Sequence, residues 1–367
     1  MKDGLDADAV ARIAKNLRRA WKEFPAQAFL RDATVGLDEL ELKQRIAHVI
    51  AALAQHLPKD FERALAVLLE AGGAWDAGDP DDPLSGFAAW PVIDYVGVHG
   101  LERPEESLEG LRQLTHLFSA EMAVRPFLRQ QTELTLQTLA VWTDDENEHV
   151  RRLVSEGTRP RLPWAGRLTD FIRDPSPVLA LLEQLKDDSS EYVRRSVANN
   201  LNDISKDHPQ RVVEVCRDWQ KSAGTERLWV IRHATRTLVK AGHPQVWRLL
   251  GYADPPEVAV RRLRIEETTI RLGAYLEFSF QLRSQSGEPQ RLIVDYQVHH
   301  VKANGKTTPK VFKLKTLELL PGAAVDVGKR HPFRQVTTRR YYSGTHTLEI
   351  LVNGQSAGKR RFELLVE

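Results

Sequence analysis

The amino-acid sequence predicts a two-domain protein of the multidomain α-then-β class: a HEAT-like α-solenoid over residues 1–255, followed by an immunoglobulin-like β-sandwich over residues 256–367. Three observations predict this fold class. A chain of 367 residues is longer than one ordinary hydrophobic core supports. A motif recurs about every 40 residues in the first part, which is typical of stacked helix pairs. After Asp254-Pro-Pro256, the hydrophobic pattern changes from helical spacing to alternation.

Apolar residues at helical spacing predict three helices at the start of the chain. The first follows Asp6, which can cap it. Its apolar positions are Val10, Ile13, Leu17 and Trp21. The second helix covers residues 40–53, and the third covers residues 61–73 and ends at a pair of glycines. Residues 74–86 are rich in Asp, Pro and Gly and predict an acidic surface loop.

An internal repeat predicts the solenoid. Residues 144–156 (DDENEHVRRLVSE) align with residues 187–199 (DDSSEYVRRSVAN) at an offset of 43 residues, and a looser copy at residues 225–237 follows 38 residues later. An acidic turn that opens a Val-Arg-Arg helix at this spacing is typical of HEAT repeats. Stacked repeats of this kind form a long concave face, which suits an extended ligand.

The last part of the chain predicts about seven short strands. Phe278, Phe280 and Leu282 alternate with polar residues, and Asn304-Gly305 and Asn353-Gly354 are strong signals for two-residue hairpin turns. This pattern fits an immunoglobulin-like sandwich without a disulfide. The single cysteine, Cys216, excludes a disulfide framework and a thiolate zinc cluster, and its amphipathic surroundings predict a buried structural thiol.

Charge is unevenly distributed between the two predicted domains. Residues 257–367 hold 19 Lys and Arg against 11 Asp and Glu, whereas the whole chain has a net charge of only +2. A basic domain on an acidic body indicates a polyanionic partner, with DNA-backbone binding favoured modestly over lysines that merely protect edge strands. The basic residues gather at two hairpins: Lys302, Lys306, Lys310, Lys313 and Lys315 at one, and His331, Arg334, Arg339 and Arg340 at the other.

Targeting signals are not evident. The first ten residues contain no apolar signal-peptide core, and the sequence has no apolar stretch of about 18 residues. We therefore expect a cytoplasmic protein with no membrane partner. Nothing in the sequence indicates an obligate dimer, so we expect a monomer.

One carboxylate occurs in only one copy of the repeat. At 3.6 residues per turn, His149, Arg152 and Glu156 share one stripe of their helix, and the other two copies have no acid at the position of Glu156. Spacing alone favours an exposed Arg152–Glu156 surface pair over a functional site. Glu121 follows Leu117 and Phe118 by helical intervals, which predicts a carboxylate on or beside an apolar face. A functional group and a structural pair with Arg125 or with an arginine of the next repeat are equally supported.

The segment of residues 156–167 is the most unusual in the chain. Two prolines keep it from forming a helix. Trp164 is flanked by Arg159, Arg161 and Arg167, and arginines beside an exposed aromatic ring suit phosphates and a stacked base or sugar. A linker whose tryptophan fills a gap between helix pairs is an equally weighted alternative.

Three motifs together resemble the AlkC branch of the HEAT-like-repeat DNA alkylation glycosylases. They are residues 90–100 (WPVIDYVGVHG), 118–127 (FSAEMAVRPF) and 149–165 (HVRRLVSEGTRPRLPWA), of which the last is long and specific. The resemblance covers about residues 1–255, and the added immunoglobulin-like domain resembles one subset of that branch. It implies an enzyme that hydrolyses the N-glycosidic bond of cationic N3-alkylated bases in double-stranded DNA, notably 3-methyladenine. It further implies no metal, no cofactor and no base flipping.

The resemblance also assigns roles to residues. It implies that Glu121 and Glu156 are the catalytic carboxylates, that Trp164 lies beside the lesion, that Arg152 is a phosphate or charge partner and, more weakly, that Asp203 contributes. The sequence further nominates the basic residues Arg159, Arg161, Arg167, Lys302, Lys306, Lys313 and Arg339 as DNA-binding residues.

The chemistry agrees with these roles. A base alkylated at a ring nitrogen is a cation and leaves easily, while positive charge develops on the deoxyribose, where a carboxylate can stabilise it and orient water. Our hypothesis from the sequence is that Glu156 faces the sugar and the water, with Glu121 in support. 3-Methylcytosine is a further candidate substrate. A non-catalytic HEAT scaffold that binds DNA or protein is the alternative, and in a third interpretation the sandwich binds protein rather than DNA.

Overall fold

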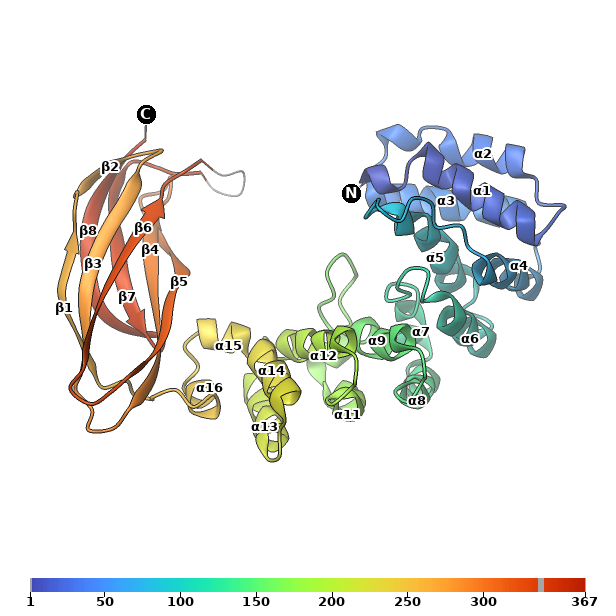
Figure 1. Cartoon of the computed structure of the whole chain (residues 1–367). Helices are drawn as coiled ribbons and strands as arrows, with labels where there is room; N and C mark the ends of the chain where they lie inside the picture. Colours follow the sequence, from blue (N-terminus) through green and yellow to red (C-terminus); the bar gives the residue numbers. More distant parts are fainter. Residues whose placement is uncertain (1, 336–339, 367) are drawn as a thin grey trace. The chain divides into compact units, whose positions relative to one another are not determined.

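The computed structural model describes residues 2–335 and 340–366, which form two compact units (Figure 1). The first unit comprises residues 1–207 and 223–234, and the second comprises residues 208–222 and 235–367. Helices give way to strands between Leu249 and Val258, as the sequence predicts. In the described part of the chain, no helix is long and apolar enough to cross a membrane.

The first unit consists of helices joined by turns and loops. They are α1 (Ala7–Ala20), α2 (Ala26–Thr34), α3 (Leu42–His56), α4 (Phe61–Gly73), α5 (Trp90–His99), α6 (Pro104–Leu114), α7 (Arg125–Gln130), α8 (Thr132–Trp142), α9 (Glu148–Gly157), α10 (Thr169–Arg173), α11 (Ser176–Leu185), α12 (Glu191–Ile204) and α14 (Thr225–Ala234). The three helices predicted at the start of the chain correspond to α1, α3 and α4. The carboxylate of Asp6 accepts the amide of Ala9 at 2.9 Å and caps α1, because the first amides of a helix lack partners within it.

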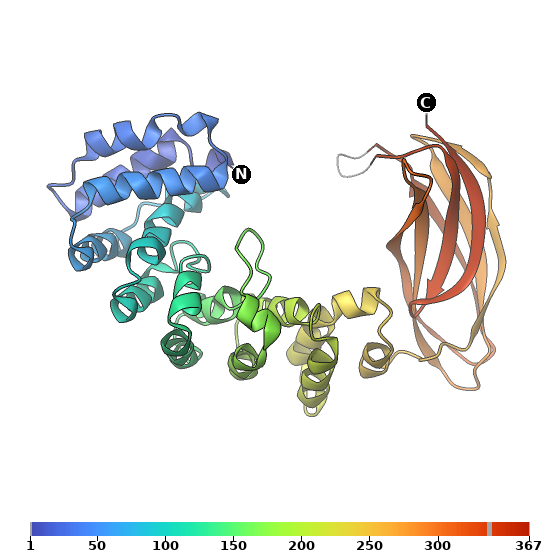
Figure 2. The ribbon, with the colours of Figure 1, turned by 180° about the vertical axis from the view of Figure 1, so that it is seen from behind.

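The predicted repeats are confirmed. The helices of the three copies, α9, α12 and α14, lie side by side as one layer, and α8 and α11 pack behind α9 (Figures 1 and 2). In each of α9 and α12 an acidic turn precedes the helix, and arginine side chains bind it. Arg151 donates to both carboxylate oxygens of Asp188, at 2.6 and 3.0 Å, which ties one repeat to the next. The third copy departs from the pattern, since α14 ends at Ala234 and a new short helix follows.

The second unit contains the sandwich and three helices. The helices are α13 (Pro209–Gln220), α15 (Arg236–Lys240) and α16 (Pro244–Leu249). The strands are β1 (Val258–Ile265), β2 (Thr269–Arg271), β3 (Tyr275–Ser284), β4 (Gln290–Val301), β5 (Thr307–Leu319), β6 (Ala324–Pro332), β7 (Gly344–Val352) and β8 (Gln355–Leu365). They form a three-stranded sheet in the order β1-β3-β6 and a five-stranded sheet in the order β2-β8-β7-β4-β5.

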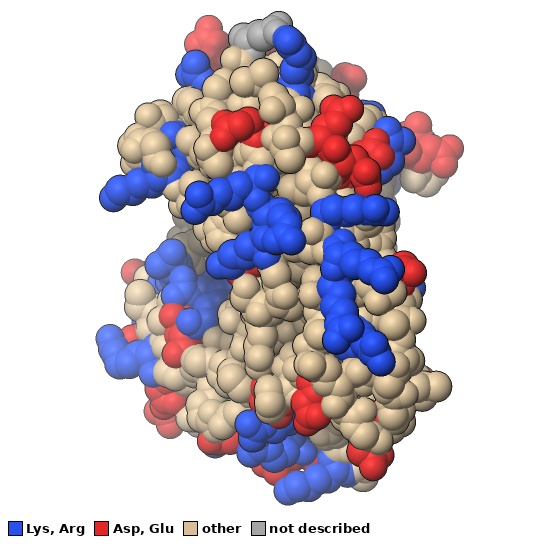
Figure 3. All heavy atoms as spheres, turned by 90° about the vertical axis from the view of Figure 1, so that its left-hand side faces the viewer, with Lys and Arg blue, Asp and Glu red and all other residues tan. Residues whose placement is uncertain are grey.

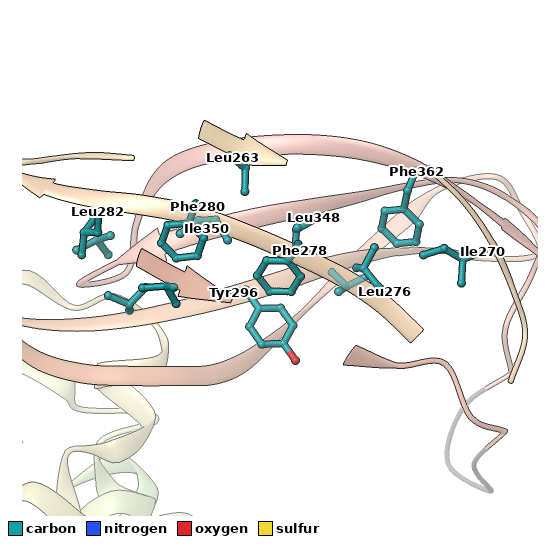
Figure 4. Packing of buried hydrophobic residues seen from close by; sticks show 14 of the residues in the cluster. Leu263, Ile270, Leu276, Phe278, Phe280, Leu282, Tyr296, Leu348, Ile350 and Phe362 are labelled. Carbon is teal, nitrogen blue, oxygen red and sulfur yellow. The ribbon is translucent and has the colours of Figure 1, made fainter. Parts of the chain in front are cut away.

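The two sheets enclose one apolar core, shown in Figure 4. Phe278 and Phe280 on β3 face Tyr296 on β4 and Ile350 on β7, and each of these side chains is at most 2% exposed. Alternate positions along each strand point inward, as the alternation in the sequence predicts. The described strands number eight, against about seven predicted.

Both Asn-Gly pairs lie in hairpin connections, but only the second is the predicted two-residue turn. Asn304-Gly305 lies within the longer connection of residues 302–306 between β4 and β5, whereas Asn353-Gly354 alone joins β7 to β8, with φ angles of 46° and 75°. Such left-handed angles suit Asn and Gly. The second turn also explains why α15 and α16 belong to this unit: a Cβ atom on Gly354 would lie 2.7 Å from the Cα atom of Gly242, so the backbones are in close contact. Cys216 on α13 is fully buried, and burial raises its pKa to about 12, as expected of a structural thiol.

Candidate active site

Five of the predicted site residues come from neighbouring elements of the first unit. Arg152 and Glu156 lie on α9, Asp203 lies near the end of α12, and Arg159 follows α9 by two residues. Glu121 lies in the turns between α6 and α7, so its predicted position on a helical face is wrong. The helix ends at Leu114, and the amide of Ala120 binds the hydroxyl of Thr115 at 3.2 Å instead of continuing the helical pattern.

The side chains of these five residues form a continuous row of alternating charges. Arg152 donates to Glu121 at 2.7 Å and lies 3.6 Å from Glu156. Arg159 donates to Glu156 at 2.6 Å and to Asp203 at 2.8 Å. We name this row, from Glu121 through Arg152, Glu156 and Arg159 to Asp203, the acid–arginine row. The structure thus brings together all three predicted carboxylates.

The acid–arginine row is largely withdrawn from solvent. The side chains of Glu156 and Asp203 are 7% and 3% exposed. Burial by itself would lower the pKa of Arg152, but the charges of Glu121 and Glu156 outweigh it and raise this pKa. The prediction from spacing, that Arg152 and Glu156 form an exposed surface pair, is therefore wrong, because neighbouring repeats cover both side chains. The structural alternative for Glu121 is present, with an arginine of the next repeat as its partner, so the carboxylate is held in a fixed orientation.

Glu121 and Glu156 differ in how many of their oxygens are occupied. In Glu156, Oε1 accepts a hydrogen bond from the guanidinium of Arg159, and Oε2 accepts one from the hydroxyl of Ser196 at 2.6 Å. In Glu121, Oε2 accepts hydrogen bonds from both the hydroxyl of Ser119 and the guanidinium of Arg152. Within the described part of the chain, Oε1 of Glu121 has no hydrogen-bond partner, and this side chain is 19% exposed. Glu121 is therefore the carboxylate with an oxygen available to a further molecule.

Trp164 is exposed and belongs to the loop of residues 158–168. Figures 1 and 2 show this loop in green. Its φ angle is 64°, a strained conformation for a residue with a side chain. Arg125 holds this loop with three hydrogen bonds of 2.7–2.9 Å to the carbonyls of Gly157, Arg159 and Gly166. Lys43 of α3 donates to the carbonyl of Trp164 itself. These contacts compensate the strain and fix the position of the indole ring.

The indole ring of Trp164 is half exposed and continues an aromatic stack. It lies 6.2 Å from the ring of Trp90 at an interplanar angle of 16°, and Trp90 stacks on Phe118 at 5.1 Å. Phe118 precedes Glu121 by three residues in the same turn segment. The alternative in which Trp164 fills a gap between helix pairs does not fit a ring that is 50% exposed.

The predicted DNA-binding arginines of this loop differ in whether a carboxylate of the protein already binds the guanidinium group. Arg159 is committed to Glu156 and Asp203, and Arg161 donates to both oxygens of Asp207 at 2.8 and 2.6 Å. These ion pairs oppose a direct role of the two arginines in phosphate binding, since the carboxylates already neutralise them. Arg167 is exposed and has no partner among the residues that the structure describes.

Sequence reasoning missed Asp94 and the positioning role of Arg125. Asp94 lies on α5, where one carboxylate oxygen accepts the indole N–H of Trp90 at 2.9 Å. Burial, and to a smaller extent the charge of Glu121, raises the pKa of Asp94 to about 7. The available signal was a single acid within the apolar run of residues 90–98.

The raised pKa of Asp94 predicts a pH-dependent effect on stability. The folded protein retains this proton while the unfolded chain releases it near pH 4, so ionisation opposes folding as the pH rises from about 4 to 7. Asp94→Asn should therefore gain stability relative to wild type over this range, by roughly 2–4 kcal/mol in the free energy of unfolding. Urea denaturation at pH 4.5, 6 and 8 measures the difference. A difference that does not change with pH would show that Asp94 is ionised throughout.

Exposed basic residues of the sandwich include two groups. Lys302, Lys306 and Lys313 are exposed at the β4–β5 hairpin, as predicted, whereas Arg339 lies outside the described residues. At the second hairpin that the sequence nominated, Arg334 and Arg340 are exposed, but His331 is buried. A second group, which the sequence analysis did not single out, comprises exposed residues of β1 and β8: Arg261, Arg262, Arg264, Lys359, Arg360 and Arg361. Figure 3 shows Lys and Arg side chains gathered on the side of the sandwich where β1 lies. In the described ranges, no three His, Cys, Asp or Glu residues are grouped as metal ligands would be.

Comparisons with known proteins match both parts of the chain. Residues 118–238 match the family described as DNA alkylation repair enzyme, and residues 259–366 match the C-terminal Ig-like domain of the uncharacterised protein YhaZ. The uncharacterized protein YhaZ of Bacillus subtilis is 36% identical over 367 residues, which cover 99% of each chain. The structure is similar to that of the Pseudomonas fluorescens alkylpurine DNA glycosylase AlkC bound to DNA containing an abasic site analog. That protein is 38% identical, 99% of each chain is covered, and the TM-score is 0.91.

Proposed function

Because the chain belongs to the AlkC-type family of DNA alkylation repair enzymes, we propose that it is a DNA glycosylase that hydrolyses the N-glycosidic bond of cationic N3-alkylated bases. The proposed substrate is 3-methyladenine in double-stranded DNA, and the products are the free base and an abasic site. 3-Methylcytosine is a cation of the same kind and is the second substrate to test.

The observation that carries the proposal is the free Oε1 oxygen of Glu121 at the end of a fixed row of charges. Departure of a cationic base needs no general acid, and the transition state concentrates positive charge on the deoxyribose. A carboxylate that is already oriented stabilises this charge without reorganising. Arg152 and Ser119 hold Glu121 in this way, and Glu156 in turn holds Arg152.

This geometry favours an exchange of the roles that the sequence suggested. Both oxygens of Glu156 accept hydrogen bonds within the protein, whereas Glu121 keeps one oxygen for a sugar or a water molecule. We propose that Glu121 contacts the sugar and the attacking water and that Glu156 supports it through Arg152. Asp203 supports Arg159 at the other end of the row.

We propose that the lesion stays in the DNA while the bond breaks, as the resemblance implies. The exposed indole ring of Trp164 supports this proposal, because a ring fixed at the surface can lie against the DNA beside the lesion. Arg167, which is exposed in the same loop, is the arginine best placed to meet a phosphate.

Incubation with methylated duplex DNA tests the proposed function. The protein should release free 3-methyladenine, measured by chromatography of the small-molecule fraction, and leave abasic sites. The Glu121→Gln, Glu156→Gln double variant is the control for spontaneous depurination. Salt-dependent binding of the same DNA without any release of base would support the non-catalytic scaffold instead.

The lysines of the β4–β5 hairpin provide a separate prediction for the sandwich. Reversal of three charges by Lys302→Glu, Lys306→Glu and Lys313→Glu should weaken duplex binding on the order of 10-fold or more at low salt, because lysine–phosphate contacts release counterions. Fluorescence anisotropy at several salt concentrations measures the loss.

The second basic group supplies a matched control with the same change in net charge. The variant Arg261→Glu, Arg262→Glu, Arg361→Glu should weaken binding less, since we assign DNA to the β4–β5 hairpin. A larger loss in this control would place the DNA-binding surface at β1 and β8. No loss in either variant would support a sandwich that binds protein.

A further inference from the structure

A pocket of about 300 Å³ lies between α3, α5, α7 and the loop of residues 158–168. This volume is at the lower end of the range for small-ligand pockets, about 300–1,000 Å³. The residues that matter for its chemistry are Lys43, Trp90, Asp94, Arg125, Arg129 and Trp164. The mechanism proposed above uses the exposed face of Trp164 but not this pocket.

Two residues of the pocket have buried polar atoms without a partner. The Oδ1 oxygen of Asp94 and the Nε atom of Arg125 are each shielded from solvent, and neither makes a hydrogen bond within the described part of the chain. Such atoms are costly to leave unsatisfied, so a molecule that presents a donor to one and an acceptor to the other would be stabilised there. Asp94 as a whole is partly exposed, but its Oδ1 oxygen is shielded from solvent by the surrounding protein.

The remaining lining favours a flat heteroaromatic molecule. Trp90 and Trp164 contribute two indole rings that are inclined by only 16° to each other, and Ile46, Ile50 and Met122 add apolar surface. Flat rings prefer offset stacking on such surfaces. A purine combines this shape with an exocyclic amine that donates and ring nitrogens that accept, as the carboxyl of Asp94 and the guanidinium of Arg125 require.

Charge distinguishes a neutral purine from an alkylated, cationic one. Three cations, Lys43, Arg125 and Arg129, line the pocket, against the single carboxyl of Asp94. Burial lowers the pKa of Arg125 only to about 10, so Arg125 remains charged at neutral pH. A cationic base is therefore repelled. The base loses its positive charge when the glycosidic bond breaks, so the repulsion disappears with the reaction.

We propose that the pocket bounded by Trp90, Asp94, Arg125 and Trp164 binds a free neutral purine base, the one that the reaction releases. This inference rests on the proposed glycosylase function for the origin of the base, but binding of the base can be measured without any reaction. The pocket accepts the base after bond cleavage and delays its release into solution.

Isothermal titration calorimetry with free 3-methyladenine and with adenine tests the proposal directly on the full chain. Both purines should bind in a one-to-one ratio, and thymine should bind much more weakly because it has one ring and no exocyclic amine. Ala47 on α3 lines the pocket and is itself exposed, so Ala47→Phe can fill the pocket without disturbing the core. This variant should raise the Kd for both purines about 10-fold or more, because a phenyl ring takes the space of the base.

The matched control is Ala51→Phe. Ala51 is exposed one turn further along α3 and does not line the pocket. Its Kd for purines should equal that of the wild type. In multiple-turnover excision, added 3-methyladenine should inhibit the wild type and the control more strongly than Ala47→Phe.

The outcomes separate this inference from the proposed function. Excision without measurable binding of free purines, or equal affinity in Ala47→Phe and Ala51→Phe, would overturn the pocket and leave the glycosylase intact. Purine binding that Ala47→Phe abolishes, in a protein that releases no base from methylated DNA, would support the pocket and refute its role as a product site.

Discussion

Glu121→Gln is expected to lower single-turnover excision of 3-methyladenine about 10²–10³-fold, the usual cost of losing one preorganised charge at a transition state. The glutamine side chain keeps the shape of Glu121 and can still accept the hydrogen bonds of Ser119 and Arg152, so the fold should persist. What is lost is the negative charge at the free oxygen. Affinity for a duplex that contains an abasic-site analog should therefore change little. Quench-flow or manual sampling of base release, together with anisotropy, measures both quantities.

The control for this variant is Glu105→Gln on α6, which removes an exposed carboxylate and should leave the excision rate unchanged. Glu121→Asp distinguishes direct contact of the carboxylate with the sugar or water from the electrostatic effect of its charge. This variant keeps the negative charge but moves it back by one methylene group. Direct contact with the sugar or water predicts a large loss in this variant as well. If Glu121→Gln excises at the wild-type rate, Glu121 has no part in the chemistry.

Glu156→Gln is expected to lower both excision and stability. The carboxylate of Glu156 lies between Arg152 and Arg159 and accepts the hydroxyl of Ser196, and it is buried. Loss of its charge leaves two buried guanidinium groups with weaker partners, which should cost about 1.5–3 kcal/mol of the free energy of unfolding. Excision should fall by about 10²-fold or more, because Arg152 no longer holds Glu121 in one orientation. Thermal denaturation and single-turnover excision measure the two effects.

Glu148→Gln is a control on the same helix, since Glu148 is exposed in the first turn of α9. It should change neither quantity by much. The comparison of the two catalytic variants decides between the two assignments of roles. If Glu156→Gln loses excision with unchanged stability while Glu121→Gln remains active, the original assignment of the water to Glu156 is correct and the exchange proposed above is wrong.

The sequence predicted the elements and their order because local patterns encode them. The periodic apolar residues of α1, α3 and α4, the repeated acidic turn and Val-Arg-Arg helix, and the Asn-Gly turns each appear in the structure where the pattern places them. The three motifs of the resemblance also identified the family, which the comparisons confirm. Segments of this kind depend mainly on residues close to one another in the chain.

The environment of the site residues could not be predicted in the same way. Arg152 at helical spacing from Glu156 suggested an exposed pair, yet residues of α12 cover it, among them Ser196 and Tyr192, whose ring lies 4.8 Å from the guanidinium of Arg152. Glu121 was placed on a helix because Leu117 and Phe118 precede it at helical intervals, but that helix ends before them. Burial and partners depend on contacts between repeats about 40 residues apart, and no local pattern reports them.

By itself, the sequence determined that this protein is a stack of helix repeats followed by a β-sandwich, and that Glu121, Glu156 and Trp164 were its chemical candidates. Only the tertiary structure decided that Arg152 and Arg159 link the carboxylates in one row, that Arg125 fixes the loop of Trp164, and that Asp94 lines a pocket. The physical reason is that periodicity fixes which face of a helix is apolar, whereas the partner of each charge, and hence its energy, depends on which other helix folds against that face.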